Sequence, residues 1–429
     1  MAGAVADRVV RARWEEGRAV GRRFRASASL VVAAVVLLPA VASAFHLGFV
    51  EAEWDGVGGV DGIGAAFSVA VSPDGAHVYV AAWGDSSLAV FTRDPATGRL
   101  TFVEAQWDDA GGVDGLAGAY SVVVSPDGAH VYAAGLLDNA VAVFARDPAS
   151  GALTFVEVER DGVGGVEGLA GASAVVVSPD GDHVYATGFW DNSVAAFARQ
   201  PTGALTFVEV ERDGVGGVEG LANATGVAVS PDGAHVYVAG EGDHAVAVFA
   251  RQAASGALDF VEAEVDGTGG VTALAGASAV AVSPEGATVY ATGAYDSGLV
   301  AFIRDPISGA LSLLEEYLNG QGGVAGMNGP RGLAVSPDWQ HVYVAAYGGD
   351  AVVSFARQPL GGALTFLEFR DSSWGVVGLQ GARSVASSPD GRNLYVAGAD
   401  DSAVVALVRM LFGDGFERGT TSEWSTTVP

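Results

Sequence analysis

Cysteine is absent from the 429 residues, and so is lysine. Without cysteine the chain has no disulfide, no thiol nucleophile and no thiolate metal ligand, so its stability must come from packing. The 50 acidic residues outnumber the 22 basic ones and give a formal net charge of −28. A surface of this charge repels nucleic acid and anionic lipid, so we expect neither as a partner.

Apolar runs long enough to span a bilayer are also scarce near the N-terminus. The run Leu30–Val41 is shorter than the roughly 20 residues that a membrane helix needs. Arginines within residues 22–25 precede it, and the small residues 42–44 follow it, which is typical of a secretory signal. We predict a signal peptide at residues 1–44 and a mature protein that is periplasmic or extracellular, without a membrane span. A retained anchor is the alternative.

A repeat dominates the rest of the chain. Ser-Pro-Asp-Gly or a close variant recurs at intervals of 52 or 53 residues. Its serines are Ser72, Ser125, Ser178, Ser230, Ser283, Ser336 and Ser388. Each repeat holds four short apolar runs bounded by turn sequences, which predicts four strands, A to D. In the first repeat these strands are 68–72, 77–82, 88–93 and 100–107.

Radial stacking is the arrangement in which such four-stranded antiparallel sheets bury both faces. The repeat therefore predicts an all-β fold, a seven-bladed β-propeller over residues 45–410, followed by a polar tail at 411–429. Residues 45–54 match the D-strand sequence that begins at Leu205, but no A, B or C strand precedes them. The last repeat lacks a D strand. We expect the N-terminal strand to complete the last blade; an open solenoid is the alternative.

The direction of the strands divides the loops between two faces. Turns A–B and C–D share a short-loop face, whereas turns B–C and the D-to-A crossovers share a long-loop face. The crossovers and B–C turns are rich in acids, so we predict an acidic long-loop face. Calcium ligands are one interpretation, with Asp108, Asp109 and Asp114 as candidates, and a solvated acidic surface is the other. No other cofactor is expected.

The positions that break the repeat are the candidates for function. The residue five before each Ser-Pro, at the predicted channel mouth, is not constant among the blades. In order, these residues are Phe67, Tyr120, Ser173, Thr225, Ser278, Arg331 and Arg383. Guanidinium groups in two adjacent blades suit a small anionic ligand. Salt bridges to neighbouring acids are the alternative.

Aromatic side chains are predicted at the same mouth. We expect Phe67, Tyr120, Trp83 and Tyr347 to contact the ligand, because aromatic faces stack on sugars and cations. Packing between blades is the alternative for these rings. The repeated arginines, such as Arg146, are expected to bridge to carboxylates of the Asp74 type on the short-loop face, and the repeated histidines of strand B are assigned to architecture.

The repeats resemble a known family. Ser72-Pro-Asp-Gly-Ala-His-Val-Tyr-Val-Ala81 and the segment Ala140–Leu153 are similar to the YVTN repeats of bacterial lactonase-like seven-bladed propellers. Gly329-Pro-Arg-Gly332 resembles a Gly-Pro-Arg-His segment of that family, which implies that Arg331 binds a substrate carboxylate or lactone carbonyl. Gly332 stands where the family has histidine, so the group that would activate water is missing there.

Three functions remain open from the sequence. The leading hypothesis is a non-enzymatic exported propeller, a monomer, that binds a small anionic or sugar-like ligand or another exported protein. The first alternative is a lactonase-like hydrolase, related to 6-phosphogluconolactonase, acting on a sugar-acid lactone. The second alternative is a calcium-stabilised surface protein. No catalytic residue is assigned, because nucleophile-elbow, zinc-protease and Walker motifs are absent.

Overall fold

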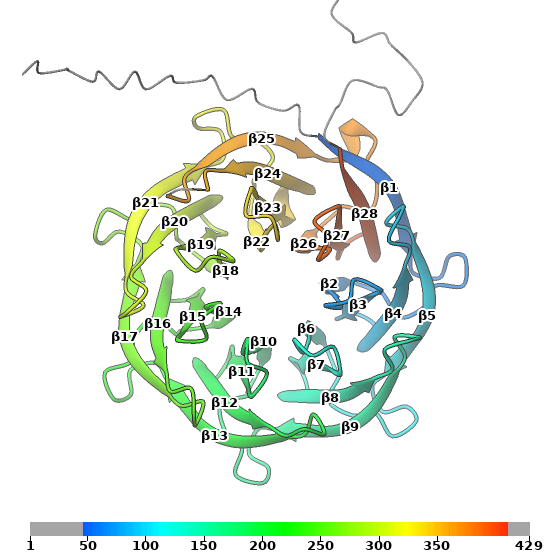
Figure 1. Cartoon of the computed structure of the whole chain (residues 1–429), viewed down its shortest axis with the longest axis horizontal. Helices are drawn as coiled ribbons and strands as arrows, with labels where there is room; N and C mark the ends of the chain where they lie inside the picture. Colours follow the sequence, from blue (N-terminus) through cyan, green and yellow to red (C-terminus); the bar gives the residue numbers. More distant parts are fainter. Residues whose placement is uncertain (1–45, 360, 411–429) are drawn as a thin grey trace, which may run out of the picture. The chain divides into compact units, whose positions relative to one another are not determined.

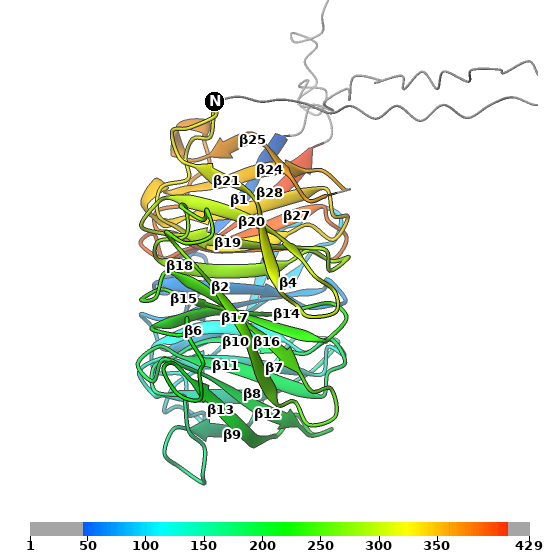
Figure 2. The same ribbon diagram turned by 90° about the vertical axis from the view of Figure 1, so that its left-hand side faces the viewer.

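Seven four-stranded antiparallel sheets surround a central axis in the computed structural model, which describes residues 46–359 and 361–410 (Figure 1). The all-β seven-bladed propeller predicted from the sequence is confirmed. The predicted signal peptide and the predicted polar tail lie outside the described residues. Viewed from the side, the loops gather at the two faces of the ring, because the strands run from one face to the other (Figure 2).

The strands follow the A-to-D order in every blade, from the axis outward. The A strands are β2 (Ala66–Val71), β6 (Ala119–Val124), β10 (Ala172–Val177), β14 (Ala224–Val229), β18 (Ala277–Val282), β22 (Pro330–Val335) and β26 (Ala382–Ser387). The B strands are β3 (His77–Ala82), β7 (His130–Gly135), β11 (His183–Gly188), β15 (His235–Gly240), β19 (Thr288–Gly293), β23 (His341–Ala346) and β27 (Asn393–Gly398).

The C and D strands form the outer half of each blade. The C strands are β4 (Ser87–Arg93), β8 (Ala140–Arg146), β12 (Ser193–Arg199), β16 (Ala245–Arg251), β20 (Gly298–Arg304), β24 (Ala351–Arg357) and β28 (Ala403–Met410). The D strands are β5 (Leu100–Trp107), β9 (Leu153–Arg160), β13 (Leu205–Arg212), β17 (Leu258–Val265), β21 (Leu311–Leu318), β25 (Leu364–Arg370) and β1 (His46–Trp54). The loops of the described residues also contain two 3-10 turns, Tyr347–Gly349 and Ser372–Trp374.

The ring is closed by the first strand. β1 pairs antiparallel with β28, from His46 opposite Met410 to Trp54 opposite Ala403, and completes blade 7. The backbone N–H of Leu47 also donates to Glu368 Oε1 of blade 6 at 2.6 Å. The closure predicted from the unmatched D-strand sequence is therefore confirmed.

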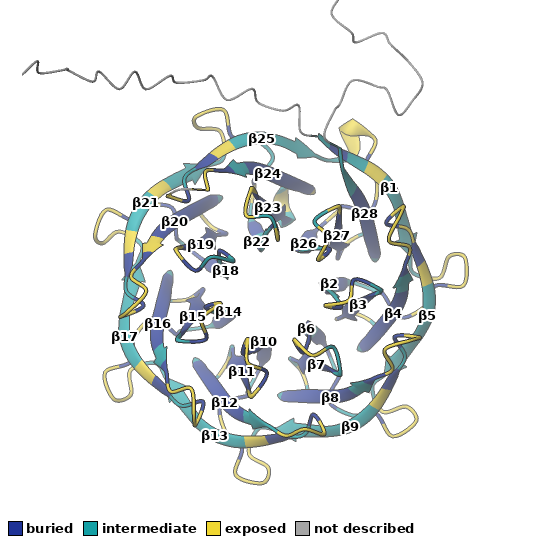
Figure 3. Ribbon diagram, viewed as in Figure 1, coloured by how far each residue is buried: buried dark blue, intermediate teal, exposed yellow. Residues whose placement is uncertain are grey.

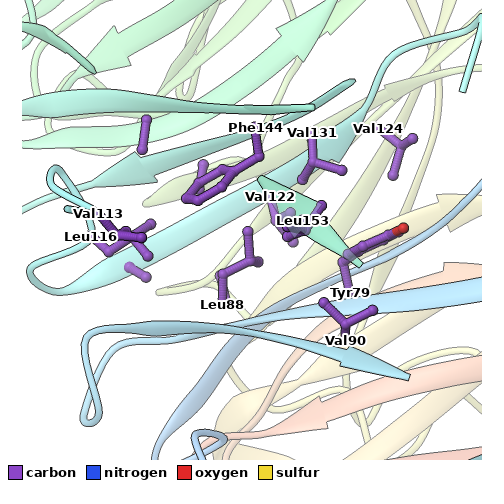
Figure 4. Close-up of a cluster of buried hydrophobic side chains, with 14 residues drawn as sticks. Tyr79, Leu88, Val90, Val113, Leu116, Val122, Val124, Val131, Phe144 and Leu153 are labelled. Atoms are coloured by element: carbon purple, nitrogen blue, oxygen red, sulfur yellow. The ribbon is translucent and has the colours of Figure 1, made fainter. Parts of the chain in front are cut away.

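The hydrophobic core lies between neighbouring blades. The B and C strands are almost fully buried, whereas the D strands on the rim are partly exposed (Figure 3). Between blades 1 and 2, Tyr79, Leu88 and Val90 of one sheet pack against Val122, Val131 and Phe144 of the next (Figure 4).

A polar contact that we call the inter-blade clamp joins the blades on the short-loop face. Arg146 of blade 2 donates to Asp74 Oδ2 at 2.7 Å and to the Tyr79 hydroxyl at 2.8 Å. It also donates to His77 Nδ1 at 2.7 Å when His77 is neutral and carries its proton on Nε2. Its side chain is 1 % exposed. The predicted bridge from the repeated arginine to the Asp74-type carboxylate is confirmed. Burial alone would raise the pKa of the Asp74 carboxyl, but hydrogen bonds from Ser72, Ala76 and Arg146 outweigh it and lower that pKa to about 2.

The clamp recurs around the ring with two departures. In blade 5, Glu285 and Thr288 replace the aspartate and the histidine, and Arg357 pairs with Glu285. In blade 7, Asn393 replaces the histidine and accepts from Arg93 Nη2 at 2.7 Å. The histidines thus serve the architecture.

Candidate functional site

A β-bulge near the start of every A strand shapes the mouth of the channel. In β2, Ala66 pairs with Ala82 and Ser68 with Ala81, so Phe67 is the extra residue. The same shift occurs in the other six A strands, at the residue that breaks the repeat. A bulge re-aims the side chain of its extra residue, and these seven side chains line the central cavity of about 190 Å³. The structure therefore brings together the residues that the sequence singled out.

Three of the seven bulge residues use their hydroxyl groups within the fold. Ser173 donates to the carbonyl of Ala224 at 2.7 Å, and Ser278 donates to the carbonyl of Pro330 at 2.8 Å. Thr225 reaches the carbonyl of Ser278 at 3.2 Å. Each contact joins neighbouring A strands, so blades 3 to 5 contribute hydroxyl groups that are already hydrogen-bonded.

Arg331 of blade 6 forms an ion pair across the mouth. Its Nη1 donates to Glu241 Oε2 of blade 4 at 2.8 Å, and Tyr295 donates to Glu241 Oε1 at 2.8 Å. Glu241 is 9 % exposed. Burial opposes ionisation of Arg331, but the hydrogen bond and the charge of Glu241 raise its pKa. The salt bridge left open as an alternative is present for this arginine.

Glu241 was not among the predicted site residues. It occupies the position eleven residues after the serine of Ser-Pro, where other blades have Trp83, Leu136 or Phe189. The remaining blades have Ala294, Tyr347 and Ala399 there, so Glu241 is the one acid at this position of the repeat, and that signal would have identified it.

Arg383 of blade 7 has different surroundings. Its guanidinium carbon lies 3.9 Å from the ring centroid of Phe67, 4.8 Å from that of Tyr120 and 5.9 Å from that of Tyr347. Nη2 also donates to the Tyr120 hydroxyl. Among residues 46–359 and 361–410, Arg383 has no carboxylate partner. Aromatic faces thus hold a cation whose remaining N–H donors are not used by an acid.

The other predicted aromatic residues support this arrangement. Trp83 stacks on Phe67 with centroids 5.8 Å apart and is 39 % exposed. Tyr347 donates to Asp400 Oδ1 at 3.1 Å; burial and the acceptor carboxylate raise the pKa of Tyr347. All six predicted ligand residues therefore belong to one region, but Arg331 and Arg383 reach in different directions, toward blades 4 and 2, and do not form a single clamp.

Gly332 has a structural requirement of its own. A Cβ at this position would lie 2.6 Å from the carbonyl oxygen of Arg383 and 2.8 Å from Cα of Ser384. Blades 6 and 7 are thus too close for a side chain at residue 332, and the missing histidine could not be restored without moving a strand.

The acids of the long-loop face mostly fasten the crossovers. Asp55 Oδ1 accepts from the backbone N–H groups of Gly62 and Ile63 at 3.0 and 3.1 Å, and Asp85 accepts from Gly64 at 2.6 Å. Equivalent bonds recur in the other crossovers. These carboxylates therefore hold loop backbone, which the sequence alone did not show.

One carboxylate cluster in the described part of the chain has metal-ligand spacing. Its members, Asp108, Asp114 and Asp138, offer oxygens within 4.8 Å of one another. Asp109, the third calcium candidate, is not a member. Arg160 bonds to Asp114 at 2.7 Å and approaches Asp138 at 3.3 Å, so a cation of the chain itself already lies in the cluster.

The fold and the mouth define a closed seven-bladed propeller with an arginine-bearing channel, and comparison with known proteins gives its family. The family described as "Lactonase, 7-bladed beta-propeller" matches overlapping segments 56–157, 116–275, 226–372 and 271–410. The chain belongs to this lactonase propeller family, as the YVTN resemblance implied. Among curated proteins, none matches the sequence.

Solved structures share the fold at low identity. A periplasmic gluconolactonase from Pseudomonas aeruginosa is 24 % identical with a TM-score of 0.58, over 72 % of this chain and 85 % of that one. A proposed 6-phosphogluconolactonase from Bacteroides uniformis is 20 % identical with a TM-score of 0.57, over 71 % and 87 %. A hydrazine synthase from Kuenenia stuttgartiensis is 17 % identical with a TM-score of 0.58, over 83 % and 99 %.

Within 46–359 and 361–410, no helix has both the length and the apolar character needed to cross a bilayer.

Proposed function

We propose that the protein is a lactonase-type hydrolase that binds a small hydroxy-acid lactone at the channel mouth. The proposal rests on the surroundings of Arg383 in a chain of the lactonase family. This cation lies on aromatic faces and has no carboxylate partner in the described residues. The comparisons favour this alternative over the interaction protein that led the sequence-based hypotheses.

Arg383 supplies the electrostatic part of the proposed reaction. Its free N–H groups donate to the carbonyl oxygen of the lactone, and they stabilise the negative charge that develops there when water adds to the carbonyl carbon. The ring C–O bond then breaks, the ring oxygen takes up a proton, and the product is the open hydroxy acid. The same N–H groups bind the carboxylate of that product.

Glu241, a buried carboxylate that contacts Arg331 of the mouth, is our candidate for the group that accepts the proton of the attacking water. Both of its oxygens are engaged, by Arg331 and Tyr295, so one of these bonds must open for the carboxylate to act as a base. Because of this requirement, ligand binding without turnover is the second candidate function.

A panel of lactones tests the proposal. We expect the purified chain to hydrolyse at least one lactone, with kcat/KM reduced about 100-fold in Arg383→Ala and in Glu241→Gln. Arg160→Ala is the matched control, since it removes an arginine of the long-loop face outside the mouth, and it should leave kcat/KM unchanged. Binding of the hydroxy acid without hydrolysis of any lactone would establish the second candidate. Neither binding nor hydrolysis would overturn the proposal.

Export is part of the proposal. The pattern of residues 1–44 supports it, and so does the periplasmic gluconolactonase of the same fold. Intact mass measurement on protein recovered from its native host should show a chain that begins at Phe45; a full-length mass in the cytoplasmic fraction would contradict export.

A further inference from the structure

Apolar side chains gather on one side of the mouth. Five apolar side chains stand at the start of the B–C turns in blades 1 to 3, just before the acids of those turns, and we call them the apolar arc: Trp83, Leu136, Leu137, Phe189 and Trp190. Trp83, Leu137 and Trp190 are 39 %, 51 % and 51 % exposed. At the corresponding positions of blades 4 to 7, Glu241, Tyr295, Tyr347 and Asp400 take part in polar contacts. The mouth is therefore apolar on one side and polar on the other.

The apolar arc is continuous with the surroundings of Arg383. The Phe67 ring lies under the guanidinium of Arg383 and also stacks on Trp83. A Cβ built on Gly118 would lie 3.1 Å from Trp83 Nε1 and 2.8 Å from Leu137 Cγ, so both side chains border the same crossover. A ligand whose anionic group contacts Arg383 thus has exposed apolar side chains beside it.

Many polar groups at the mouth are already occupied. The hydroxyl groups of Ser173, Thr225 and Ser278 donate to backbone carbonyls. Glu241 accepts from two side chains, and Tyr347 donates to Asp400. A polyhydroxylated ligand gives up hydrogen bonds to water at each hydroxyl, and these protein groups, whose own hydrogens are already used, can offer it acceptor lone pairs only, so it regains only part of what it loses. An apolar substituent has no hydrogen bonds to water that the site would have to replace.

We infer that the ligand is a small carboxylic acid, or the corresponding lactone, that carries an aliphatic or aryl substituent rather than several hydroxyl groups. The inference rests on the proposed function, because it assumes that Arg383 contacts the carboxylate or lactone carbonyl. The substituent lies against Trp83 and Leu137, beside the Phe67 ring, where apolar contact stabilises the complex. The cavity of about 190 Å³ accepts the polar head, and the apolar arc covers the substituent.

Calorimetric binding to the full chain with four probes tests the inference: 3-phenylpropanoate, its uncharged amide, octanoate and gluconate. We expect 3-phenylpropanoate and octanoate to bind at least about tenfold more tightly than gluconate, and the amide to bind about tenfold more weakly than its acid. Trp83→Ala and Leu137→Ser should remove most of the preference over gluconate. Trp374→Ala is the matched control, because Trp374 is 61 % exposed but lies outside the apolar arc, and it should preserve the preference.

The outcomes separate the inference from the proposed function. Binding that depends on Arg383 but shows equal or greater affinity for gluconate would overturn the inference and keep the proposed function. A preference that survives in both Trp83→Ala and Leu137→Ser would also overturn it. If none of the acids binds, or if Arg383→Ala binds them unchanged, the proposed function fails together with the inference. Thermal unfolding of each variant, compared with the parent, identifies any loss of binding that is due to misfolding.

Discussion

The short-loop face and the channel mouth use the same seven blades in opposite ways. On the short-loop face nearly every blade offers the same arginine, acid, histidine and tyrosine to its neighbour, and the seven clamps together fasten the ring. At the mouth the bulge residue changes from phenylalanine and tyrosine through serine and threonine to arginine. The repeated positions form the contacts between blades, and the positions that depart from the repeat are those to which we assign the proposed ligand site.

Breaking one clamp should have the largest effect on stability. Arg146→Ala leaves the hydroxyl of Tyr79, the Asp74 carboxylate and His77 without their shared donor, so we expect the free energy of unfolding to fall by about 3 to 5 kcal/mol. Urea unfolding measures this. Arg160→Ala removes a half-exposed ion pair and should cost less than about 1 kcal/mol. Equal losses in the two variants would contradict a special role for the clamp.

Acidification should weaken the same face. Burial and the nearby Arg409 lower the pKa of His341 to about 4, from 6.5. Between pH 6.5 and pH 4 the histidine therefore takes up a proton in the unfolded chain but not in the native chain. The free energy of unfolding is thus expected to fall by about 3 kcal/mol as the pH is lowered from 6.5 to 4. His341→Asn, which copies the Asn393 of blade 7, should flatten the dependence of Tm on pH in this range. An unchanged slope would contradict this assignment.

The arginines of the mouth should differ in their effects on stability. Arg331→Ala leaves Glu241 buried without its cation, so we expect a loss of about 1 to 2 kcal/mol. Arg383→Ala leaves no acid unpaired and should change the free energy of unfolding by less than about 1 kcal/mol. Chemical denaturation of the two variants side by side would sharpen the comparison; a large loss in Arg383→Ala would make that residue structural.

A substitution in the inter-blade clamp of blade 5 should stabilise the protein. Glu285 Oε2 is buried and has no hydrogen-bond partner within the described part of the chain, whereas Asp74 accepts from Ser72 at 2.5 Å and from the Ala76 N–H at 3.0 Å. Glu285→Asp should restore these bonds and raise the free energy of unfolding by about 1 kcal/mol. The reverse change, Asp74→Glu, is the control and should lower it by a similar amount.

Calcium should have the smallest effect. Arg160 already neutralises part of the cluster of Asp108, Asp114 and Asp138, so we expect millimolar calcium to shift Tm by less than about 1 °C. A rise of several degrees that chelator reverses would show a calcium site and contradict this expectation.

The sequence predicted most of the fold because its signals are local and repeated. The turn at Ser72-Pro-Asp-Gly75 and the unmatched strand at residues 45–54 were sufficient to predict the blades and their closure. The mouth positions followed from the repeat as well. The side-chain contacts could not be predicted in the same way. Arg383 lies on Phe67 and Arg331 reaches Glu241 because the bulges set the directions of the two arginines and because Glu241 stands in a turn two blades away from Arg331.

The pairing of β1 with β28 also sets an order of events. The ribosome makes β1 long before β28. The strand that closes the ring therefore has no partner strand until nearly the whole chain has been made. Contacts between such distant segments form slowly, because a long loop must close first. Blade 7 is thus the last to be completed, and Arg383, on strand β26 of that blade, is among the last residues of the mouth to enter the folded ring.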